Sequence, residues 1–322
     1  MESLTRRSFM AGVAAATGAA LAGPAFGSPA FGSATPANSV PLGLQLYLVK
    51  DALEKDFDGT LHALAAMGYR DVELPSFFRR SAAELRASLA ASGLTCRSSH
   101  VPPAPFLPGD PSLAADLPKV IDICKELGLE YVVSPIPHVG PRLAPELEAA
   151  KPDFQKIKQV FAELNLDDWK GYADFLNETG AKLKFSGLKL AHHTHNLEFK
   201  EFGGVPALET LIERTDPNLV CFELDCGWVA AAGHDPVKVL RRHAARIRLL
   251  HLKDLTALYV PNTLLQMESV ECGRGTIYWP ALLAAAEAAG IRHAYIEQEP
   301  PFSRPTLESA RISLEFLRGV RA

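Results

Sequence analysis

The sequence predicts an α/β protein that folds as a single (β/α)8 barrel. From Pro41 onward, short runs rich in Val, Ile and Leu alternate with amphipathic segments, and there are eight of each. Short apolar runs of this kind are typical of buried strands, and the longer periodic segments are typical of helices packed on one face. Strict alternation favours parallel strands joined by right-handed crossovers, and residues 41–322 suit the usual length of such a barrel.

The elements can be placed in chain order. The expected strands are residues 43–49, 71–74, 95–100, 131–134, 188–195, 219–225, 247–252 and 294–297. The expected helices are residues 58–67, 81–91, 113–127, 168–183, 205–214, 236–244, 279–289 and 306–318. The glycines expected to end helices are Gly68, Gly93, Gly128, Gly180 and Gly290. An open doubly wound sheet is the alternative, but no G-x-G-x-x-G pattern follows the first strand.

Two connections are long for a barrel of this kind. Residues 135–167 are rich in Pro, Leu and charged residues, and we expect a short extra helix there. Residues 254–278 form the second long connection. Both follow strands, so both are expected at the catalytic face of the barrel, where long loops form lids or specificity walls.

The first forty residues resemble a twin-arginine export signal. Arg6 and Arg7 stand in T-R-R-S-F-M, just before an apolar run over residues 9–22 that is followed by small residues. The run is too short and too weakly apolar for a stable membrane anchor. We therefore expect residues 1–40 to be a signal peptide and linker, and residues 41–322 to be the catalytic domain. The resemblance implies transport by the twin-arginine export machinery to a periplasmic or secreted location.

Composition excludes several classes of protein. Hydrophobic residues make up 48% of the 322 residues and charged residues 22%, which are ordinary values for a folded domain rather than a disordered chain. A net charge of −4 supplies no general basic field, so nucleic acid is not an expected partner. The five cysteines show no C-x-x-C spacing. A Cys221–Cys226 disulfide is conceivable, but both residues fall on or beside one strand, where the geometry is poor.

Ionisable side chains gather at the carboxyl ends of the expected strands, which is where barrel enzymes carry their functional groups. They are Glu73, His100, His138, His193, His195, Glu198, Asp225, His251, Lys253, Asp254, Glu297 and Glu299. Buried carboxylates at this density repel one another unless a cation neutralises them. A mixed oxygen and nitrogen donor set without a thiolate suits Mn²⁺, Mg²⁺, Co²⁺ or Zn²⁺.

Several local patterns, in this order along the chain, carry a family resemblance. They are G-L-Q-L-Y (43–47), G-Y-R-D-V-E-L (68–74), H-H-T-H-N-L-E-F (192–199), E-L-D-C-G-W (223–228), H-L-K-D (251–254), G-R-G-T-I-Y-W (273–279) and Y-I-E-Q-E (295–299). Together they resemble the xylose-isomerase-like TIM barrels that are usually labelled sugar phosphate isomerase/epimerase. The resemblance implies that Glu198, Asp225, His251 and Glu297 bind one divalent metal ion.

The resemblance also implies a reaction, which is removal of a proton beside the carbonyl group of a small-molecule sugar. Glu198 and Glu297 are expected to flank the substrate carbon from two faces, with His195 and Lys253 as further catalytic groups. The expected substrate contacts are Glu73, His100, His193, Trp228 and Arg274. His192 and Thr194 replace the Tyr and Asn that are usual in the family, so the substrate is expected to differ while the metal ligands are kept.

Two other functions remain open from the sequence. The same enolisation in a 3-keto-glycoside would expel the substituent on C1, which makes the enzyme a lyase or an apparent glycosidase. An exported protein would meet free sugars and glycosides rather than sugar phosphates, and no phosphate-binding motif is evident beyond residues 273–275. A barrel that binds a sugar or a metal without turnover is the second alternative. The endonuclease branch of the superfamily fits less well, because it would need more metal ligands and a basic groove.

Overall fold

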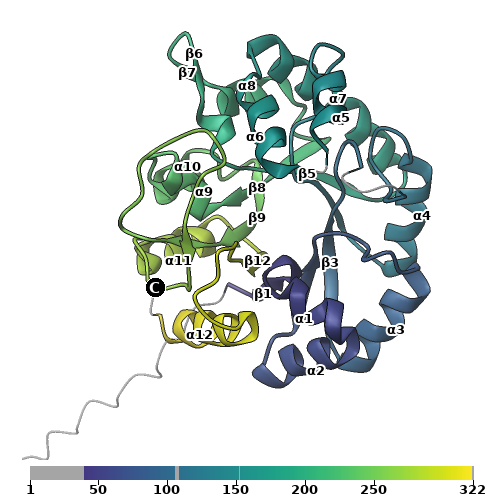
Figure 1. Ribbon diagram of the computed structural model, residues 1–322, viewed down its shortest axis with the longest axis vertical. Coiled ribbons are helices and arrows are strands. Elements are labelled where there is room, and N and C mark those ends of the chain that lie inside the picture. Colours follow the sequence, from purple (N-terminus) through teal and green to yellow (C-terminus); the bar gives the residue numbers. More distant parts are fainter. Residues whose placement is uncertain (1–39, 106–108, 152, 321–322) are drawn as a thin grey trace, which may run out of the picture. The chain divides into compact units, whose positions relative to one another are not determined.

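A computed structural model describes residues 40–105, 109–151 and 153–320. Eight parallel strands close into a barrel in the order β1-β12-β9-β8-β5-β4-β3-β2 (Figure 1). The strands are β1 (Leu42–Gln45), β2 (Asp71–Leu74), β3 (Thr95–His100), β4 (Tyr131–Ser134), β5 (Lys189–His193), β8 (Val220–Asp225), β9 (Ile247–Leu252) and β12 (His293–Ile296). The predicted barrel is confirmed. The predicted signal peptide and linker, apart from Val40, lie outside the described residues.

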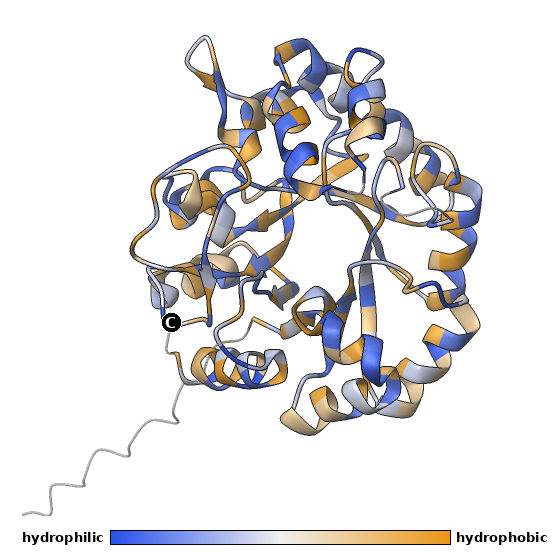
Figure 2. Cartoon of the chain, in the orientation of Figure 1, coloured by the Kyte–Doolittle hydropathy of each residue, from blue (hydrophilic) through white to orange (hydrophobic). Residues whose placement is uncertain are grey.

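Helices surround the barrel, and in Figure 2 hydrophobic and hydrophilic residues alternate along them as expected for amphipathic helices. The helices that follow the eight strands are α2 (Phe57–Met67), α3 (Ala82–Ser92), α4 (Leu117–Leu127), α7 (Leu166–Phe185), α8 (Ala207–Arg214), α10 (Pro236–Arg242), α11 (Trp279–Ala288) and α12 (Thr306–Gly319). Shorter helices add to these: η1 (Leu46–Val49), α1 (Lys50–Lys55), η2 (Leu197–Phe199) and α9 (Cys226–Ala231).

The two long connections carry secondary structure of their own. Residues 135–167 contain two helices, α5 (Ala144–Ala150) and α6 (Phe154–Ala162), where we expected one. Residues 254–278 contain a small antiparallel hairpin of β10 (Asp254–Leu255) and β11 (Ser269–Val270). A second hairpin, β6 (Glu201–Phe202) with β7 (Val205–Pro206), precedes α8. Because the two long connections follow barrel strands β4 and β9, they lie at the carboxyl end of the barrel.

Four of the five glycines that were expected to end helices do so. Gly68, Gly93, Gly128 and Gly290 have positive φ angles directly after α2, α3 and α4 and just past α11. The prediction for Gly180 is wrong, because this residue lies inside α7, and Gly187 with φ 82° follows the helix instead. Gly180 has a packing role: a Cβ atom there would lie 2.6 Å from the carbonyl oxygen of Leu219.

A paired substitution tests this close approach. Gly180→Ala is expected to lower the free energy of unfolding by about 1–3 kcal/mol, because the backbone of Leu219 cannot move away cheaply. Gly171→Ala is the matched control in the same helix, since no atom lies within 4 Å of the place that its new methyl group would take. Alanine favours the helix, so the control is expected to gain up to about 1 kcal/mol. Urea unfolding of both variants measures the difference, and equal effects would contradict the packing argument.

Two further features bear on earlier expectations. All five cysteines are free thiols, so Cys221 and Cys226 are not joined. Within the described ranges, no helix combines the length and the apolar character needed to cross a membrane.

Candidate active site

Five ionisable side chains enter the barrel from its last strands. Glu223 and Asp225 belong to β8, His251 to β9, and Lys253 and Glu297 directly follow β9 and β12. Side chains two residues apart on a strand point the same way, so both carboxylates of β8 face inward. Of these five residues, four are fully buried and Glu297 is 7% exposed.

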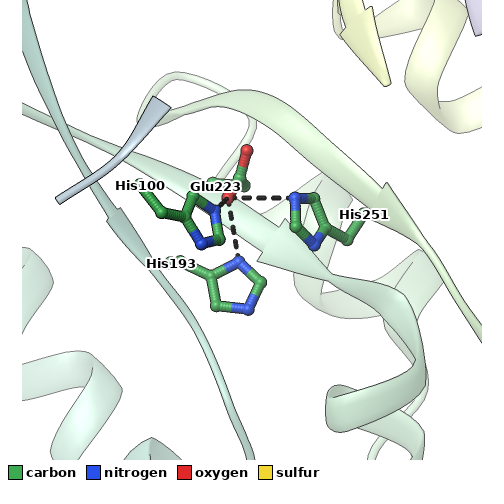
Figure 3. Close-up of side chains that lie close together, drawn as sticks. All are labelled: His100, His193, Glu223 and His251. Atoms are coloured by element: carbon green, nitrogen blue, oxygen red, sulfur yellow. Dashed lines mark hydrogen bonds and ion pairs between the residues drawn. The ribbon is translucent and has the colours of Figure 1, made fainter. Parts of the chain in front are cut away.

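The deeper part of the site is a group that we call the floor cluster, made of Glu73, His100 and Glu223. Glu223 Oε2 lies 2.9 Å from His100 Nε2 and 2.9 Å from His193 Nδ1, and 3.2 Å from His251 Nε2 (Figure 3). Glu73 Oε2 lies 2.6 Å from His251 Nε2. Ser98 and Gln45 donate to the two oxygens of Glu73. Both oxygens of Glu73 and one oxygen of Glu223 therefore have protein partners, whereas the buried Glu223 Oε1 has none.

Above the floor cluster lies the outer set, made of His193, Asp225, His251 and Glu297. Each residue offers one ligand atom, and these atoms all lie within 4.8 Å of one another. Asp225 Oδ2 is 4.0 Å from His193 Nε2 and 3.8 Å from His251 Nδ1, and Glu297 Oε2 is 2.7 Å from His251 Nδ1. The imidazoles of His193 and His251 thus each direct one ring nitrogen toward a floor carboxylate and the other toward a carboxylate of the outer set.

Lys253 supplies positive charge beside the outer set. Its Nζ lies 2.8 Å from Asp225 Oδ2, 2.9 Å from Glu297 Oε2 and 2.7 Å from Glu299 Oε1. Burial opposes the charge of this ammonium group, but the three carboxylates outweigh burial and hold the pKa of Lys253 well above its ordinary value. Gly227 leaves room for the lysine stem, since a Cβ atom there would lie 2.8 Å from Lys253 Cγ.

The outer set fits a divalent cation. It combines two carboxylates with two imidazoles, a donor set that suits Zn²⁺, Co²⁺ or Mn²⁺. Asp225 Oδ1 accepts the backbone N–H of Trp228 at 2.9 Å. Asp225 Oδ2 is buried and, despite the nearby Lys253 ammonium group, accepts no well-aligned hydrogen bond. Burial raises the pKa of Asp225 to about 6, and the attraction of Lys253 only partly offsets this rise. A cation would stabilise the charged carboxylate. The cluster could therefore bind a metal.

The floor cluster has the opposite electrostatics. Burial disfavours a charge on His100, but Glu73 and Glu223 outweigh burial and raise the pKa of this imidazole to about 9. The same contacts, with those of His251, hold the pKa of Glu73 well below its ordinary value although burial alone would raise it. Glu73 and His100 therefore compensate one another's charge. His100, His193, Glu223 and His251 nevertheless form a second group whose ligand atoms all lie within 4.8 Å of one another.

His195 stands beside the outer set and borders the pocket described below. Its ring centroid lies 5.3 Å from that of Trp228, and its Nδ1 atom has no hydrogen-bond partner. Burial, strengthened by the charge of Lys253, lowers the pKa of His195 well below its ordinary value. The imidazole is therefore neutral at neutral pH and has a free ring nitrogen.

A cavity of about 250 Å³ opens above these groups. Its polar lining consists of Gln45, Tyr47, Ser76, His100, Asp110, His193, His195, Glu297 and Glu299. Burial, together with the nearby carboxylates Glu299 and Glu297, raises the pKa of Tyr47 to about 12, so its hydroxyl keeps its proton. Within the described part of the chain, no Lys or Arg lines this cavity. The cavity therefore has acids, imidazoles and a phenol but no handle for a phosphate group.

The barrel order agrees with a sequence comparison. The family model described as xylose isomerase-like TIM barrel matches residues 61–320. The chain belongs to this family. The chain also resembles inosose dehydratases and solved structures of sugar phosphate isomerase/epimerases.

Similar curated proteins are inosose dehydratases. The protein of that name from Geobacillus thermodenitrificans (strain NG80-2) is 26% identical over 284 residues, which cover 82% of this chain and 90% of that protein. The inosose dehydratase from Geobacillus kaustophilus (strain HTA426) is 28% identical over 206 residues, which cover 62% of each protein. This second match therefore spans less than two thirds of the relative's length.

Similar solved structures establish the fold of this xylose isomerase-like barrel. A sugar phosphate isomerase/epimerase from Parabacteroides distasonis ATCC 8503 has a TM-score of 0.66 at 24% identity, covering 90% of this chain and 98% of that chain. The IOLI protein with a bound zinc atom has a TM-score of 0.63 at 16% identity, covering 86% of this chain and 96% of that chain.

Glu198 was expected to be a metal ligand of this xylose isomerase-like barrel, but it does not belong to the outer set. It lies in η2, where its Oε1 is 3.0 Å from His192 Nε2 and its Oε2 accepts the backbone N–H of His195 at 2.9 Å. His192 in turn lies 2.9 Å from the Tyr172 hydroxyl through Nδ1. Glu198 therefore holds the chain at His195, and His193 takes the fourth place among the grouped ligand atoms.

The five expected substrate contacts divide into two groups. His100, His193 and Trp228 line the cavity. Glu73 lies below it in the floor cluster, and Arg274 is outside it, half exposed and 3.8 Å from Glu271. Arg274 therefore lies outside this cavity, because the hairpin of β10 and β11 and the turn after it place its side chain at the surface. Its contact with the substrate stays a prediction.

Sequence reasoning missed Glu223 and Tyr47. Glu223 stands two residues before Asp225 on one strand, and this spacing alone puts both carboxylates on the same face. Tyr47 follows β1 in η1, where Gln45 Oε1 accepts the backbone N–H of Tyr47 at 3.2 Å and helps to turn the chain. Its exposure to the cavity depends on that turn, which has no clear sequence signal.

Proposed function

We propose that the protein is a divalent-metal-dependent lyase that acts on a keto-sugar or keto-cyclitol. It would remove the proton on the carbon beside the ketone and expel the substituent on the next carbon. The observation that carries this proposal is the outer set of two carboxylates and two imidazoles, of which His193 and Glu297 line a cavity that is also bordered by the His195 imidazole. The resemblance to inosose dehydratases supports an elimination reaction.

The proposed metal ligands are His193, Asp225, His251 and Glu297. Two imidazoles among four donors favour Zn²⁺, Co²⁺ or Mn²⁺ over Mg²⁺, which prefers oxygen ligands. When bound, the ion would stabilise the negative charge that develops on the ketone oxygen as the proton leaves.

The chain's own residues would move the protons. The His195 imidazole would accept the proton from carbon, and the electron pair of that C–H bond becomes the new C=C bond while the bond to the leaving oxygen breaks. The Tyr47 hydroxyl would donate a proton to this oxygen, which departs as water or as an alcohol. Lys253 would keep Asp225 and Glu297 charged and in position. Solvent exchange then restores both side chains.

Two observations favour the lyase over the expected isomerase/epimerase. Glu198, the second base that was expected on the opposite face, has both oxygens engaged by His192 and by the backbone of His195. The cavity has no cationic side chain for a sugar phosphate in the described chain. Isomerase/epimerase activity stays as the second candidate, because Glu297 and His195 both border the cavity and would form a two-base pair.

The deciding experiment is incubation in D₂O with a panel of inososes, 3-keto-glucosides and free sugars, followed by NMR. We expect loss of water or release of the aglycone, with an unsaturated ketone as product. Deuterium incorporation with the carbon skeleton intact would instead establish an isomerase or epimerase. Binding across the panel without exchange or product would establish a barrel that binds sugars without turnover.

His195→Gln provides a direct test of the proposed base. The variant keeps a polar side chain but has no nitrogen that can accept the proton, so kcat is expected to fall by about 10²- to 10⁴-fold. Metal content is expected to stay at the wild-type level, because His195 is outside the outer set. His62→Gln, at an exposed position of α2, is the matched control. Wild-type kcat in the His195 variant would exclude it as the base.

We also propose that the protein is exported by the twin-arginine route, on the pattern of residues 1–40. Replacing Arg6 and Arg7 by Lys is expected to leave the precursor in the cytoplasmic fraction, whereas the control Arg86→Lys should be exported normally. Fractionation followed by immunoblotting measures this. Export of the double variant at the wild-type rate would contradict the proposed route.

A further inference from the structure

The cavity is lined by a group of apolar side chains in addition to its polar residues. We call this surface the apolar wall. It consists of Phe77, Val101, Ile136, Phe154, Phe161 and Leu265. Pro75, Pro102, Pro111 and Pro135 extend it. A cavity lined by both charged and apolar side chains suits a ligand that is itself polar at one end and apolar at the other.

Much of the wall comes from segments that a barrel does not need in order to close. Phe154 and Phe161 belong to α6, and Ile136 begins the same insertion between β4 and α7. Leu265 lies in the loop between β10 and β11. Such loops at the carboxyl end of a barrel shape substrate specificity, whereas the barrel interior supplies stability. The wall is thus built from the parts of the chain that set the choice of substrate.

Leu265 is held at the wall against its backbone preference. Its φ angle is +55°, a left-handed conformation that costs a residue with a branched side chain free energy. Asn196 Oδ1 accepts the N–H of Leu265 at 3.0 Å, and Lys158 Nζ of α6 donates to its carbonyl oxygen at 2.6 Å. Asn262 also accepts from Asn196 at 2.9 Å. These bonds join the segment after β5, the β10–β11 loop and α6 into one rim and place an apolar side chain in the cavity.

The charges of the residues that line the cavity favour a neutral group over an anionic one. The ionisable lining residues other than histidine are Tyr47, Asp110, Glu297 and Glu299, and the described chain contributes no Lys or Arg to the lining. Lys158 of α6 donates to the carbonyl oxygen of Leu265, and its Nζ lies 4.9 Å from the centroid of the Phe154 ring. Phe154 is 53% exposed at the rim, although such a large aromatic side chain normally gains by burial. A neutral apolar group would cover it.

We propose that the substrate is a keto-glycoside with a neutral aromatic aglycone, which is seated on the apolar wall while the keto-sugar ring lies over the outer set. The inference rests on the proposed lyase function, because the group on the wall is then the leaving group. His195 takes the proton from C2 of a 3-keto-glycoside, the C2–H electrons form the C1=C2 bond, and the bond from C1 to the glycosidic oxygen breaks. The aglycone leaves as an alcohol after it gains a proton from Tyr47.

The test compares methyl and benzyl 3-keto-β-glucosides, because methanol and benzyl alcohol are leaving groups of similar acidity. A difference between them therefore reports contact with the ring rather than the chemistry of bond breaking. We expect kcat/KM to be about 10- to 100-fold higher for the benzyl compound, from burial of one aromatic ring. Calorimetry with the unreactive methyl and benzyl β-glucosides compares their binding affinities without turnover. We expect the benzyl compound to bind more tightly.

Two variants locate the effect. Phe154→Ala removes a half-exposed ring, so the fold is expected to tolerate it, and the benzyl preference, which is the ratio of the two kcat/KM values, should fall by about 3- to 10-fold. Phe185→Ala is the matched control, because Phe185 is 95% exposed and lies outside this cavity. Ile136→Asn introduces a polar group into the wall and should also lower the benzyl preference.

The outcomes separate this inference from the proposed function. Elimination from both glucosides with equal kcat/KM, unaffected by Phe154→Ala, would support the lyase and overturn the role of the wall. Dehydration of inososes without turnover or preferential binding of either glucoside would do the same. A third outcome is that benzyl β-glucoside binds more tightly, that Phe154→Ala loses this preference, and that no substrate undergoes elimination. This outcome would support the aromatic subsite and overturn the lyase. Preferential turnover of the benzyl compound that is lowered by Phe154→Ala supports both.

Discussion

Glu297→Gln is expected to lower metal occupancy and to reduce turnover by about 10²- to 10³-fold, because it removes one of the two charged ligands of the outer set. The substitution keeps the shape of the side chain, so packing around Leu252 and His251 is expected to be kept. Elemental analysis of protein purified without chelator should show about one divalent ion per wild-type chain and clearly less in the variant.

Two comparisons make this prediction specific. Treatment of the wild-type protein with a chelator should reproduce the loss of activity, and adding back Zn²⁺, Co²⁺ or Mn²⁺ should restore it. Glu126→Gln, an exposed position of α4, should retain both the ion and the activity. A Glu297→Gln protein with a full complement of metal and wild-type turnover would show that the outer set is not the metal site.

Lys253→Met is expected to destabilise the protein by about 3–5 kcal/mol in the absence of metal. The variant removes a buried cation and leaves Asp225, Glu297 and Glu299 without their common partner, at distances that were 2.7–2.9 Å. A divalent ion would replace part of the lost charge, so added metal should recover part of the loss. Chemical denaturation with chelator and with metal measures both effects.

Lys238→Met is the control for this substitution. The Lys238 side chain is 85% exposed and lies 3.9 Å from Asp235, so its removal should change the free energy of unfolding by less than about 0.5 kcal/mol. If the two variants were equally stable, the carboxylates around Lys253 would have to be protonated in the folded protein, and the proposed electrostatics of the site would be wrong.

The fold was predictable because apolar runs and amphipathic periods record burial directly. β2, β3, β4 and β9 begin and end at the predicted residues. β1 ends earlier than expected, since Leu46–Val49 turn into η1 while remaining apolar. A buried 3₁₀ turn and a buried strand present the same composition, so the sequence pattern could not separate them.

The site was predictable where strand geometry alone positions a side chain. The structure brings Asp225, His251 and Glu297 together, as expected from their places at strand ends. Glu198 lies beyond the end of β5, and the turn in η2 directs its carboxylate to His192 and the His195 backbone. The spacing H-x-H-x-x-E is compatible with a Glu198 side chain that faces the outer set and with one that faces away from it. The strand period alone therefore does not show whether His193 or His195 lies with the carboxylates. The local turn in η2 decides this.

The imidazoles of His193 and His251 each contact carboxylates through both ring nitrogens, and this arrangement affects which substitutions can alter the site. Each ring gives one nitrogen to a floor carboxylate, Glu223 or Glu73, at 2.9 and 2.6 Å. A carboxylate that takes the proton of one ring nitrogen increases the electron density at the other, and so strengthens it as a ligand. Neither Glu73 nor Glu223 lines the cavity. Substitutions of Glu73 or Glu223 would therefore change the affinity for the proposed ion without altering a residue that lines the cavity.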